Sequence, residues 1–322
     1  MIVPVLLFLL GFVLLIKGGD WFVDGAVGIA HRFHLPELLI GATVVSIGTT
    51  LPEVMVSAQA ALQGSAGISY GNAIGSVICN TSLIAALTLT VRPVTVHRKN
   101  LVLPTAAFFT AAVLYAGFAY TAGRFTRWNG ILFLALFALY IALSVVRMRK
   151  DPNEGEPEAL SETDRKSTLR RELLLLIAGA AAIAVGSRFL VDNGVLIAAA
   201  LGVPDSVIGL TMVALGTSLP ELITAITSLV KGHSSLSLGN IIGANFFNIA
   251  LVSGAAITIA PFSIPAGRVL FGSNASLIVD IPVMFCVMAL LCLPTLKREK
   301  ASRWQGIVLL CIYAAFCVFQ FS

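Results

Sequence analysis

The sequence predicts an all-α polytopic membrane protein with ten transmembrane helices in two inverted five-helix repeats. Three observations predict this fold class. Hydrophobic residues fill 57% of the 322 positions and charged residues only 11%, with a mean hydropathy of +0.94. The chain contains ten apolar runs of membrane-spanning length, and its second half repeats its first. Soluble domains carry about a quarter charged residues, so this composition indicates an integral membrane protein.

Each expected span is an apolar run of at least the length that a bilayer requires, about 20 residues. The first run lacks the basic start and the small-residue cleavage site of a signal peptide, so we interpret it as a membrane span. Five runs precede the one long hydrophilic stretch and five follow it. The expected spans lie near residues 3–30, 36–62, 70–90, 101–121, 128–147, 172–200, 204–230, 238–260, 269–292 and 304–321.

Basic residues are distributed unevenly between the connections. Alternate connections, beginning with the one after the first span, hold 16 of the 21 Lys and Arg residues, and the opposite set holds three. Short loops rich in Lys and Arg face the cytoplasm. The sequence therefore predicts a multi-pass protein of the cell (inner) membrane, with both termini outside and the 149–171 loop in the cytoplasm. Topology explains the formal charge of +5, and we expect no nucleic-acid partner.

The two halves are related by a shift of 168 positions. Residues 18–84 align with residues 186–252 without a gap, and 24 of 67 positions are identical. Because each half has five spans, an odd number, the second copy must enter the membrane upside down. Inverted repeats are typical of transporters whose ion site lies at the repeat interface. We divide the chain into a first five-helix repeat at 1–148, a linker at 149–171 and a second, inverted repeat at 172–322.

Other kinds of site find little support. The five Cys residues lie in apolar runs without metal-ligand spacing, so we expect free thiols. The acidic stretch from Asp151 to Asp164 lacks the ligand spacing of an EF-hand, so we interpret it as a solvated linker. No nucleophile–base constellation or phosphate-binding loop occurs, so we expect neither enzymatic activity nor a bound cofactor. Lys17 with Asp20, and Arg188 with Asp192, have the i,i+3 and i,i+4 spacing of ion pairs, so we interpret them as structural pairs or snorkelling anchors.

Each repeat contains the same unfavourable sequence inside an apolar span, GTTLPE at 48–53 and GTSLPE at 216–221. Proline cannot donate a backbone hydrogen bond, so Pro52 and Pro220 each free the carbonyl group four positions earlier. In lipid, a freed carbonyl group is tolerated only where protein, water or an ion satisfies it. We therefore expect a helix break beside a polar site in both repeats.

Side-chain oxygens surround each expected break. Four polar residues of the first repeat fall on one helix stripe, at i, i+3, i+4 and i+7: Ser46, Thr49, Thr50 and Glu53. The second copy has Ala214, Thr217, Ser218 and Glu221. Hydroxyl, carbonyl and carboxylate oxygens without sulfur or imidazole suit hard cations such as Ca²⁺ or Na⁺.

The next span of each repeat adds candidate ligands. Ser76 and Asn80 are four residues apart in GNAIGSVICN and so share a helix face, and Asn248 is the counterpart of Asn80 in GNIIGANFFN. We expect Asn80 and Asn248 to bind an ion beside the broken helices. For Asn72 and Asn240, ion binding and a bridge between helices are both compatible with the sequence.

The charge of the expected site favours exchange. Glu53 and Glu221 would place two anions near the middle of the membrane, which is strongly unfavourable unless they are compensated. One Ca²⁺ neutralises both carboxylates, and so do two Na⁺. A site that requires a bound cation, and that binds either one Ca²⁺ or two Na⁺, is suited to an exchanger. A third Na⁺ would make transport electrogenic, and the composition leaves this open.

These residues resemble a known family. VSIGTTLPE with YGNAIGSVICN, and VALGTSLPE with LGNIIGANFFN, are similar to the two alpha-repeat signatures of the calcium/cation antiporter superfamily, most closely its prokaryotic sodium/calcium exchanger branch. The resemblance spans nearly the whole chain. It implies that Glu53 and Glu221 are the central Ca²⁺ ligands and that the tilted first and sixth spans slide past the rest. It also implies four cation sites, completed by Thr49, Thr50, Thr217, Ser218, Ser76, Asn80 and Asn248 and by the main chain at Ser46 and Ala214.

Two positions depart from the family pattern. Ala244 stands where the counterpart of Ser76 is usually a serine, and Asn248 stands where some relatives have an aspartate. Both departures bear on Na⁺ stoichiometry more than on Ca²⁺ binding. Ile74 and Gly75 follow GNA, whereas the proton/calcium exchangers of the superfamily carry GNA-x-E, so the sequence argues against that branch.

The leading hypothesis is a secondary antiporter that exchanges Ca²⁺ for Na⁺ across the bilayer by alternating access. A Ca²⁺/H⁺ antiporter on the same fold, with protons carried on Glu53 or Glu221, is the first alternative. A cation channel and a non-transporting scaffold are the others, and another divalent ion such as Mn²⁺ is compatible as cargo. One central acidic pair within an inverted repeat favours alternating access over a continuous pore.

Overall fold

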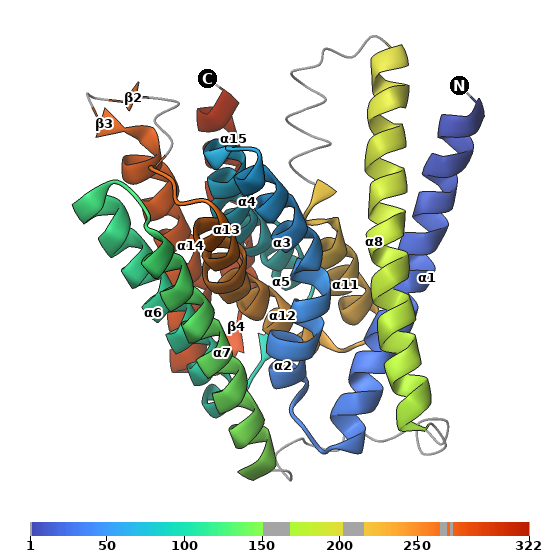
Figure 1. Ribbon diagram of the computed structural model, residues 1–322. Coiled ribbons are helices and arrows are strands. Elements are labelled where there is room, and N and C mark those ends of the chain that lie inside the picture. Colours follow the sequence, from blue (N-terminus) through green and yellow to red (C-terminus); the bar gives the residue numbers. More distant parts are fainter. Residues whose placement is uncertain (1, 151–167, 202–215, 265–268, 271–272, 322) are drawn as a thin grey trace.

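The computed structural model describes residues 2–150, 168–201, 216–264, 269–270 and 273–321. These residues form a bundle of long helices with short strands in the connections (Figure 1). Both termini lie at one end of the bundle, the top of Figure 1. We call the opposite end, where α7 (Arg127–Lys150) ends and α8 (Leu169–Ala200) begins, the linker end.

Several spans consist of two α-helices joined by a π-helical segment. The first half contains α1 (Ile2–Arg32); α2 (Glu37–Ile40), η1 (Gly41–Val45) and α3 (Ser46–Leu62); α4 (Ala66–Cys79), η2 (Asn80–Ala85) and α5 (Ala86–Val91); α6 (Arg98–Ala122); and α7. The second half contains α8; α11 (Leu219–Val230); α12 (Ser234–Phe247), η5 (Asn248–Val252) and α13 (Ser253–Ile259); η6 (Ser276–Asp280) and α14 (Ile281–Arg298); and α15 (Arg303–Phe321).

Nine helical stretches of the described residues are long and apolar enough to cross a membrane. They match nine of the ten expected spans, and the chain is an all-helical, multi-pass membrane protein. The tenth, expected near 204–230, falls partly on 202–215, outside the described residues. Its described part is α11, an apolar helix of 12 residues. Most of the expected linker, 151–167, also lies outside the described residues.

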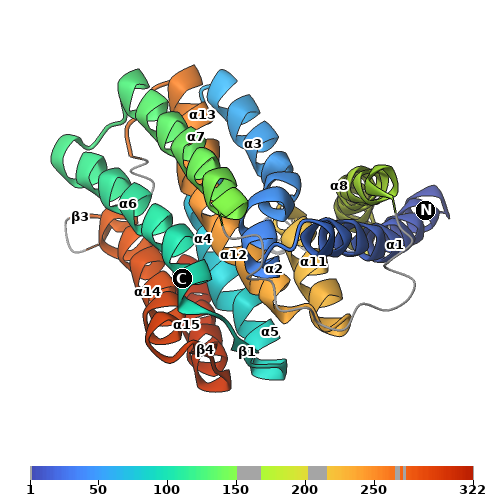
Figure 2. The same cartoon turned by 90° about the horizontal axis from the view of Figure 1, so that it is seen from below.

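Helices α1 and α8 run antiparallel to each other, to one side of the other helices (Figures 1 and 2). Their contact uses glycines at equivalent positions of the two repeats. A Cβ atom on Gly11 would lie 2.8 Å from the carbonyl oxygen of Gly186, and one on Gly186 would lie 2.9 Å from that of Gly11. A Cβ atom on Gly179 would lie 2.8 Å from the carbonyl oxygen of Gly18. The two backbones therefore meet directly across a pseudo-two-fold axis, as small residues permit in membranes.

Charged residues of α1 pair with the second repeat. Glu172 of α8 accepts two hydrogen bonds from the Arg32 guanidinium, of 2.7 Å and 2.8 Å. Lys231, which follows α11, lies 3.4 Å from the carboxylate of Asp20. Among the described residues Asp20 therefore pairs with Lys231 and not with Lys17, which leaves the role of a snorkelling anchor for Lys17. Spacing along one helix does not reveal that α11 packs beside α1 and supplies a closer cation.

The other helices form the core of the bundle, and short strands join its two halves at both ends. At the linker end, β1 (Val94–Thr95) pairs with β4 (Lys300–Ala301) in an antiparallel ladder. Towards the other end, Arg124 pairs with Ser263 in an isolated antiparallel bridge. Each pairing links a connection of the first repeat to one of the second. Strands β2 (Val269–Leu270) and β3 (Ser273–Asn274) form a separate antiparallel pair.

The two proline motifs differ in backbone structure. Helix α3 continues through Pro52, and the irregular segment of that span is η1, which precedes the motif. In the second repeat, Thr217 and Ser218 form a turn, and α11 begins at Leu219 with Pro220 in its first turn. The expected break is therefore wrong for the first repeat. A proline inside a helix can bend it without ending it, whereas one at the start fits the helix without strain.

Candidate cation-binding site

The two motif carboxylates lie inside the core. Glu53 on α3 and Glu221 in the first turn of α11 are both 0% exposed and close enough for their charges to interact. We call them the acidic pair. Neither carboxylate oxygen of Glu53 accepts a hydrogen bond from the described residues. Glu221 accepts one long hydrogen bond, of 3.5 Å, from Thr50. Buried anions with so few donors are strongly unfavourable, so the acidic pair favours cationic ligands.

Asn80 and Asn248 begin η2 and η5, at equivalent positions of the two repeats. Both are 0% exposed, and no described residue hydrogen-bonds to the side-chain oxygen or nitrogen of either. Segments of π-helix are frequent at functional sites. Helix α3 contacts η5, and α11 contacts η2. We call η2 and η5 the asparagine turns. Each glutamate-bearing helix therefore contacts the asparagine turn of the other repeat.

The predicted hydroxyl ligands accompany the acidic pair. Four of them are buried on or beside the glutamate-bearing helices: Ser46, Thr49, Thr50 and Ser218. Ser76 is buried on α4, one turn before Asn80, and Thr217 is half-buried in the turn before α11. Ala214, whose main chain the family resemblance adds to the ligands, lies outside the described residues. The described part of the site is therefore rich in oxygen ligands from both repeats.

Asn240 makes a direct contact with the predicted ligands. Its side-chain oxygen accepts hydrogen bonds from the hydroxyl groups of Ser46 and Thr49, each 3.2 Å long. Asn72 instead donates from its side-chain nitrogen to the carbonyl oxygen of Glu53, at 3.1 Å. Both asparagines therefore bridge helices, which is one of the two roles that the sequence allows. By orienting two hydroxyl groups, Asn240 also positions side chains of the site.

Sequence reasoning missed Asn245. This residue is fully buried on α12, and its side-chain nitrogen donates a 2.7 Å hydrogen bond to the hydroxyl of Thr81, next to Asn80 in η2. Asn245 therefore ties a helix of the second repeat to the asparagine turn of the first. The available signal was its spacing of three residues before Asn248, which places both on one face of a helix.

The side chains gathered here offer carboxylate, amide and hydroxyl oxygens. In the described part of the chain, no group of three or more His, Cys, Asp or Glu residues is arranged to hold a metal ion. This donor set fits hard cations and is unsuited to zinc or copper, which prefer imidazole and thiolate. The charge of the acidic pair equals in size that of one Ca²⁺ or two Na⁺.

Inverted repeats that bring such oxygens together inside a membrane bundle define a secondary cation transporter. The particular family follows from comparison with known proteins. A family model described as "Sodium/calcium exchanger protein" matches residues 3–146 and 171–322, and the chain belongs to this family of transporters. The two matched stretches correspond to the two halves of the chain, one on each side of the linker.

Individual relatives cover nearly the whole chain. The inner membrane protein YrbG of Escherichia coli is 36% identical over 313 residues, 96% of this chain and 94% of that protein. The sodium/calcium exchanger MaX1 of Methanosarcina acetivorans is 31% identical over 350 residues, 98% of each chain. The solved structure of the sodium–calcium exchanger NCX_Mj, soaked with Na⁺ and Sr²⁺, matches with a TM-score of 0.80 and 34% identity over 98% of this chain and 97% of that one. This match confirms the predicted fold class.

Proposed function

We propose that the protein is a secondary active antiporter that exchanges Ca²⁺ for Na⁺ across the membrane by alternating access. The buried acidic pair carries this proposal. Without a bound cation the site holds two anions in a non-polar bundle, so the ion-free form crosses the membrane with difficulty. One Ca²⁺ or two Na⁺ bring the charge to zero. Coupling then follows, because the protein can change conformation only when one cargo or the other is bound.

The predicted ligands divide into roles. Glu53 and Glu221 supply the charge, and a divalent ion between them takes one carboxylate from each repeat. Asn80 and Asn248 supply amide oxygens from the asparagine turns. Ser46, Ala214, Thr49, Thr50, Thr217, Ser218 and Ser76 complete the ligand sets. Because the ligands come from both repeats, the proposed site lies at the interface between them.

The choice of ions rests on the donor set and on the family. Sodium and calcium stand in the names of the relatives MaX1 and NCX_Mj, and NCX_Mj was soaked with Na⁺ and Sr²⁺. In this chain Asn248 and Ala244 offer neither a carboxylate nor a hydroxyl group at their positions. The site therefore has two acids, and a third Na⁺ would add one net positive charge to the transported complex.

The proposed location is the cell (inner) membrane, which matches the name of YrbG. Both termini would face outside and the linker end would face the cytoplasm. The excess of Lys and Arg in the connections at that end supports this orientation. The position of both termini at the opposite end of the bundle agrees with an even number of spans (Figure 1).

Calcium flux in proteoliposomes tests the proposal. Vesicles loaded with radioactive Ca²⁺ would receive an inward Na⁺ gradient, an inward H⁺ gradient or no gradient, with the membrane voltage clamped. We expect the Na⁺ gradient to drive Ca²⁺ efflux and the H⁺ gradient to leave it at the background of protein-free vesicles.

Efflux driven only by the H⁺ gradient would show that the coupling ion is H⁺ and not Na⁺. Unitary currents in a planar bilayer would identify a channel. Repeating the Na⁺-driven assay at different voltages distinguishes two Na⁺ from three for each Ca²⁺, since only the second ratio moves net charge.

A further inference from the structure

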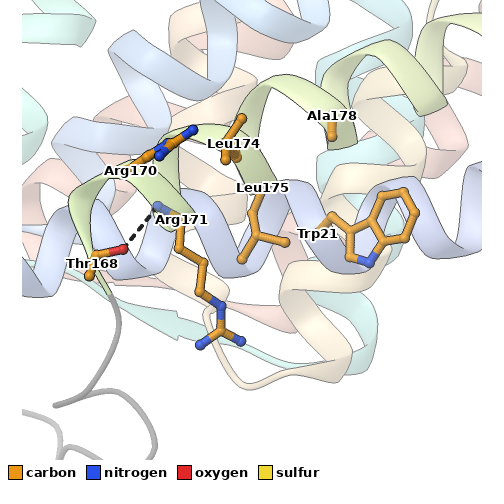
Figure 3. A pocket seen from close by; sticks show the side chains of 7 residues that line it. All are labelled: Trp21, Thr168, Arg170, Arg171, Leu174, Leu175 and Ala178. Carbon is orange, nitrogen blue, oxygen red and sulfur yellow. Dashed lines mark hydrogen bonds between the residues drawn. The ribbon is translucent and has the colours of Figure 1, made fainter.

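A pocket opens on the face of the α1–α8 pair near the linker end, away from the acidic pair. Its volume is about 420 Å³. It is lined by Trp21 of α1 and, from α8, by Arg170, Arg171, Leu174, Leu175 and Ala178 (Figure 3). None of these residues belongs to the proposed cation site, so the pocket requires an explanation of its own.

The pocket is charged at one end and apolar along the rest. Arg170 and Arg171 lie in the first turn of α8 and are exposed. Ala178 lies eight residues after Arg170, about 12 Å further along the helix at 1.5 Å per residue. Figure 3 shows Leu175 between the guanidinium of Arg171 and the ring of Trp21. The surface therefore changes from cationic to apolar over roughly the depth of one lipid headgroup and the upper part of an acyl chain.

The positive charge of the pocket is not neutralised within the described residues. Glu172, the acid nearest in sequence, is 3% exposed and holds Arg32 with two hydrogen bonds. Across the described part of the chain, no carboxylate forms an ion pair with Arg170 or Arg171. The main-chain nitrogen of Arg171 donates to the Thr168 hydroxyl at 3.4 Å, and no described carboxylate bonds to its guanidinium. The complementary ligand is therefore an anion with an apolar portion.

The pocket also lies at the right depth for a lipid. The first turn of α8 follows the linker, which the charge distribution places at the cytoplasmic surface. The cytoplasmic leaflet contains anionic phospholipids, and basic pockets between membrane helices bind their headgroups. Arginine suits this role because its planar fork donates two hydrogen bonds to one phosphate.

We propose that this pocket binds an anionic phospholipid of the adjoining leaflet. Arg170 and Arg171 hold its phosphate, and Leu174, Leu175 and Trp21 contact its acyl chain. The lipid would fasten the α1–α8 pair to one leaflet. Because this pair is the part expected to slide during alternating access, a second consequence, which rests on the proposed function, is that anionic lipid changes the rate of exchange.

Fluorescence of Trp21 tests the binding site without measuring transport. Trp128 and Trp304, which lie outside the pocket, are replaced by Phe so that Trp21 alone reports. The protein is reconstituted in phosphatidylcholine that contains a small fraction of one brominated lipid, either brominated phosphatidylglycerol or brominated phosphatidylcholine. Brominated acyl chains quench tryptophan fluorescence on contact. We expect the anionic brominated lipid to occupy the site at least about fivefold more readily, the preference that one basic residue provides near an anionic surface.

The double variant Arg170→Gln/Arg171→Gln should lose this preference. The matched control Arg92→Gln/Arg98→Gln removes two exposed arginines at the same end of the bundle and should keep it. Equal quenching by both lipids in the parent, or an unchanged preference in the Arg170/Arg171 variant, overturns the proposal. So does loss of the preference when inorganic phosphate is added, because the pocket would then be a site for soluble anions.

Exchange in vesicles with and without phosphatidylglycerol gives a separate readout. We expect the parent to respond to the anionic lipid and the Arg170/Arg171 variant to respond at least fivefold less strongly. If neither transports Ca²⁺ but Trp21 still prefers the anionic lipid, the proposed function fails and the lipid site stands. If both transport Ca²⁺ and Trp21 shows no preference, the lipid site fails alone.

Discussion

Asn72 and Asn240 occupy equivalent positions in the two repeats, yet Asn72 contacts its own repeat and Asn240 contacts the other one. Asn72 donates to the carbonyl oxygen of Glu53 at 3.1 Å, and Asn240 accepts from the hydroxyl of Thr49 at 3.2 Å. A perfectly symmetric pair of repeats would give both asparagines the same contacts. Alternating access requires such an inequality, because each repeat must be able to adopt the state that the other holds.

The two asparagines should therefore respond differently to replacement by alanine. In Asn240→Ala the hydroxyl group of Thr49 loses a buried acceptor, whereas Ser46 keeps the main-chain carbonyls of Gly41 and Asn240. The loss costs about 1–3 kcal/mol, so we expect the apparent Ca²⁺ affinity to fall about tenfold. Asn72→Ala removes the hydrogen bond that joins α4 to the main-chain carbonyl of Glu53 on α3, so the main loss should be in thermal stability. Calcium titration of flux and thermal unfolding in detergent measure the two effects. Equal affinity losses in both variants would contradict this assignment.

Glu53→Gln and Glu221→Gln should separate Ca²⁺ from Na⁺. Each variant leaves one negative charge, which one Na⁺ neutralises but one Ca²⁺ exceeds. We expect Ca²⁺ exchange to fall by about two orders of magnitude, because an uncompensated buried charge is unfavourable by several kcal/mol, while Na⁺–Na⁺ exchange persists. Radioactive ⁴⁵Ca²⁺ and ²²Na⁺ exchange measure both activities.

The matched control is Asp280→Asn, which removes a carboxylate at the start of α14, away from the acidic pair. It should leave both fluxes within about twofold of the parent, since it removes no ligand of the site. Loss of Na⁺–Na⁺ exchange together with Ca²⁺ exchange in the glutamate variants would show that charge alone does not govern the site.

Asn248→Asp should add a pH dependence to Ca²⁺ exchange. The variant gives the site a third carboxylate beside the acidic pair, so Ca²⁺ alone leaves one uncompensated negative charge. A proton on the new group restores neutrality. We expect Ca²⁺ exchange by the variant to be slower at alkaline pH and to recover by at least threefold as the pH falls. Identical pH profiles for parent and variant would mean that position 248 lies outside the ion-binding region.

Gly186→Ala should disrupt the contact between α1 and α8. The added Cβ would lie 2.9 Å from the carbonyl oxygen of Gly11, and overpacking of this kind costs about 1–3 kcal/mol. The control is Gly117→Ala on α6, where a Cβ meets nothing within 4 Å. We expect thermal stability and exchange to fall in Gly186→Ala and to be kept in the control. A melting temperature for Gly186→Ala equal to that of the control would show that the two helices separate easily.

The spans and the repeat were predictable because they depend on local properties. Hydropathy over about 20 residues marks each span. The two halves share identical residues because the equivalent positions of both repeats line the same site. The repeat also predicted the acidic pair: equivalent residues of inverted copies approach the same axis, so Glu53 and Glu221 had to lie near each other once both motifs were buried.

Features that depend on contacts between distant segments were not predictable. Pro52 suggested a helix break, but the irregular segment is η1, which ends about two turns earlier, where α12 packs closely against the chain. Asp20 was matched with Lys17 on its own helix, whereas Lys231 is nearer in space. Asn245 was missed because nothing in one helix reveals that Thr81 faces it from another.

The two strand pairings that join the repeats have a mechanical consequence. One lies at the linker end between residues 94–95 and 300–301, and the other joins Arg124 to Ser263 towards the opposite end. Because backbone hydrogen bonds join the two repeats at both ends of the bundle, the core helices of one repeat have little freedom to tilt against those of the other. For the proposed exchanger, this predicts that the core stays fixed and that α1 and α8 are the helices that move. The bound ion would then keep its position while access to it changes from one side of the membrane to the other.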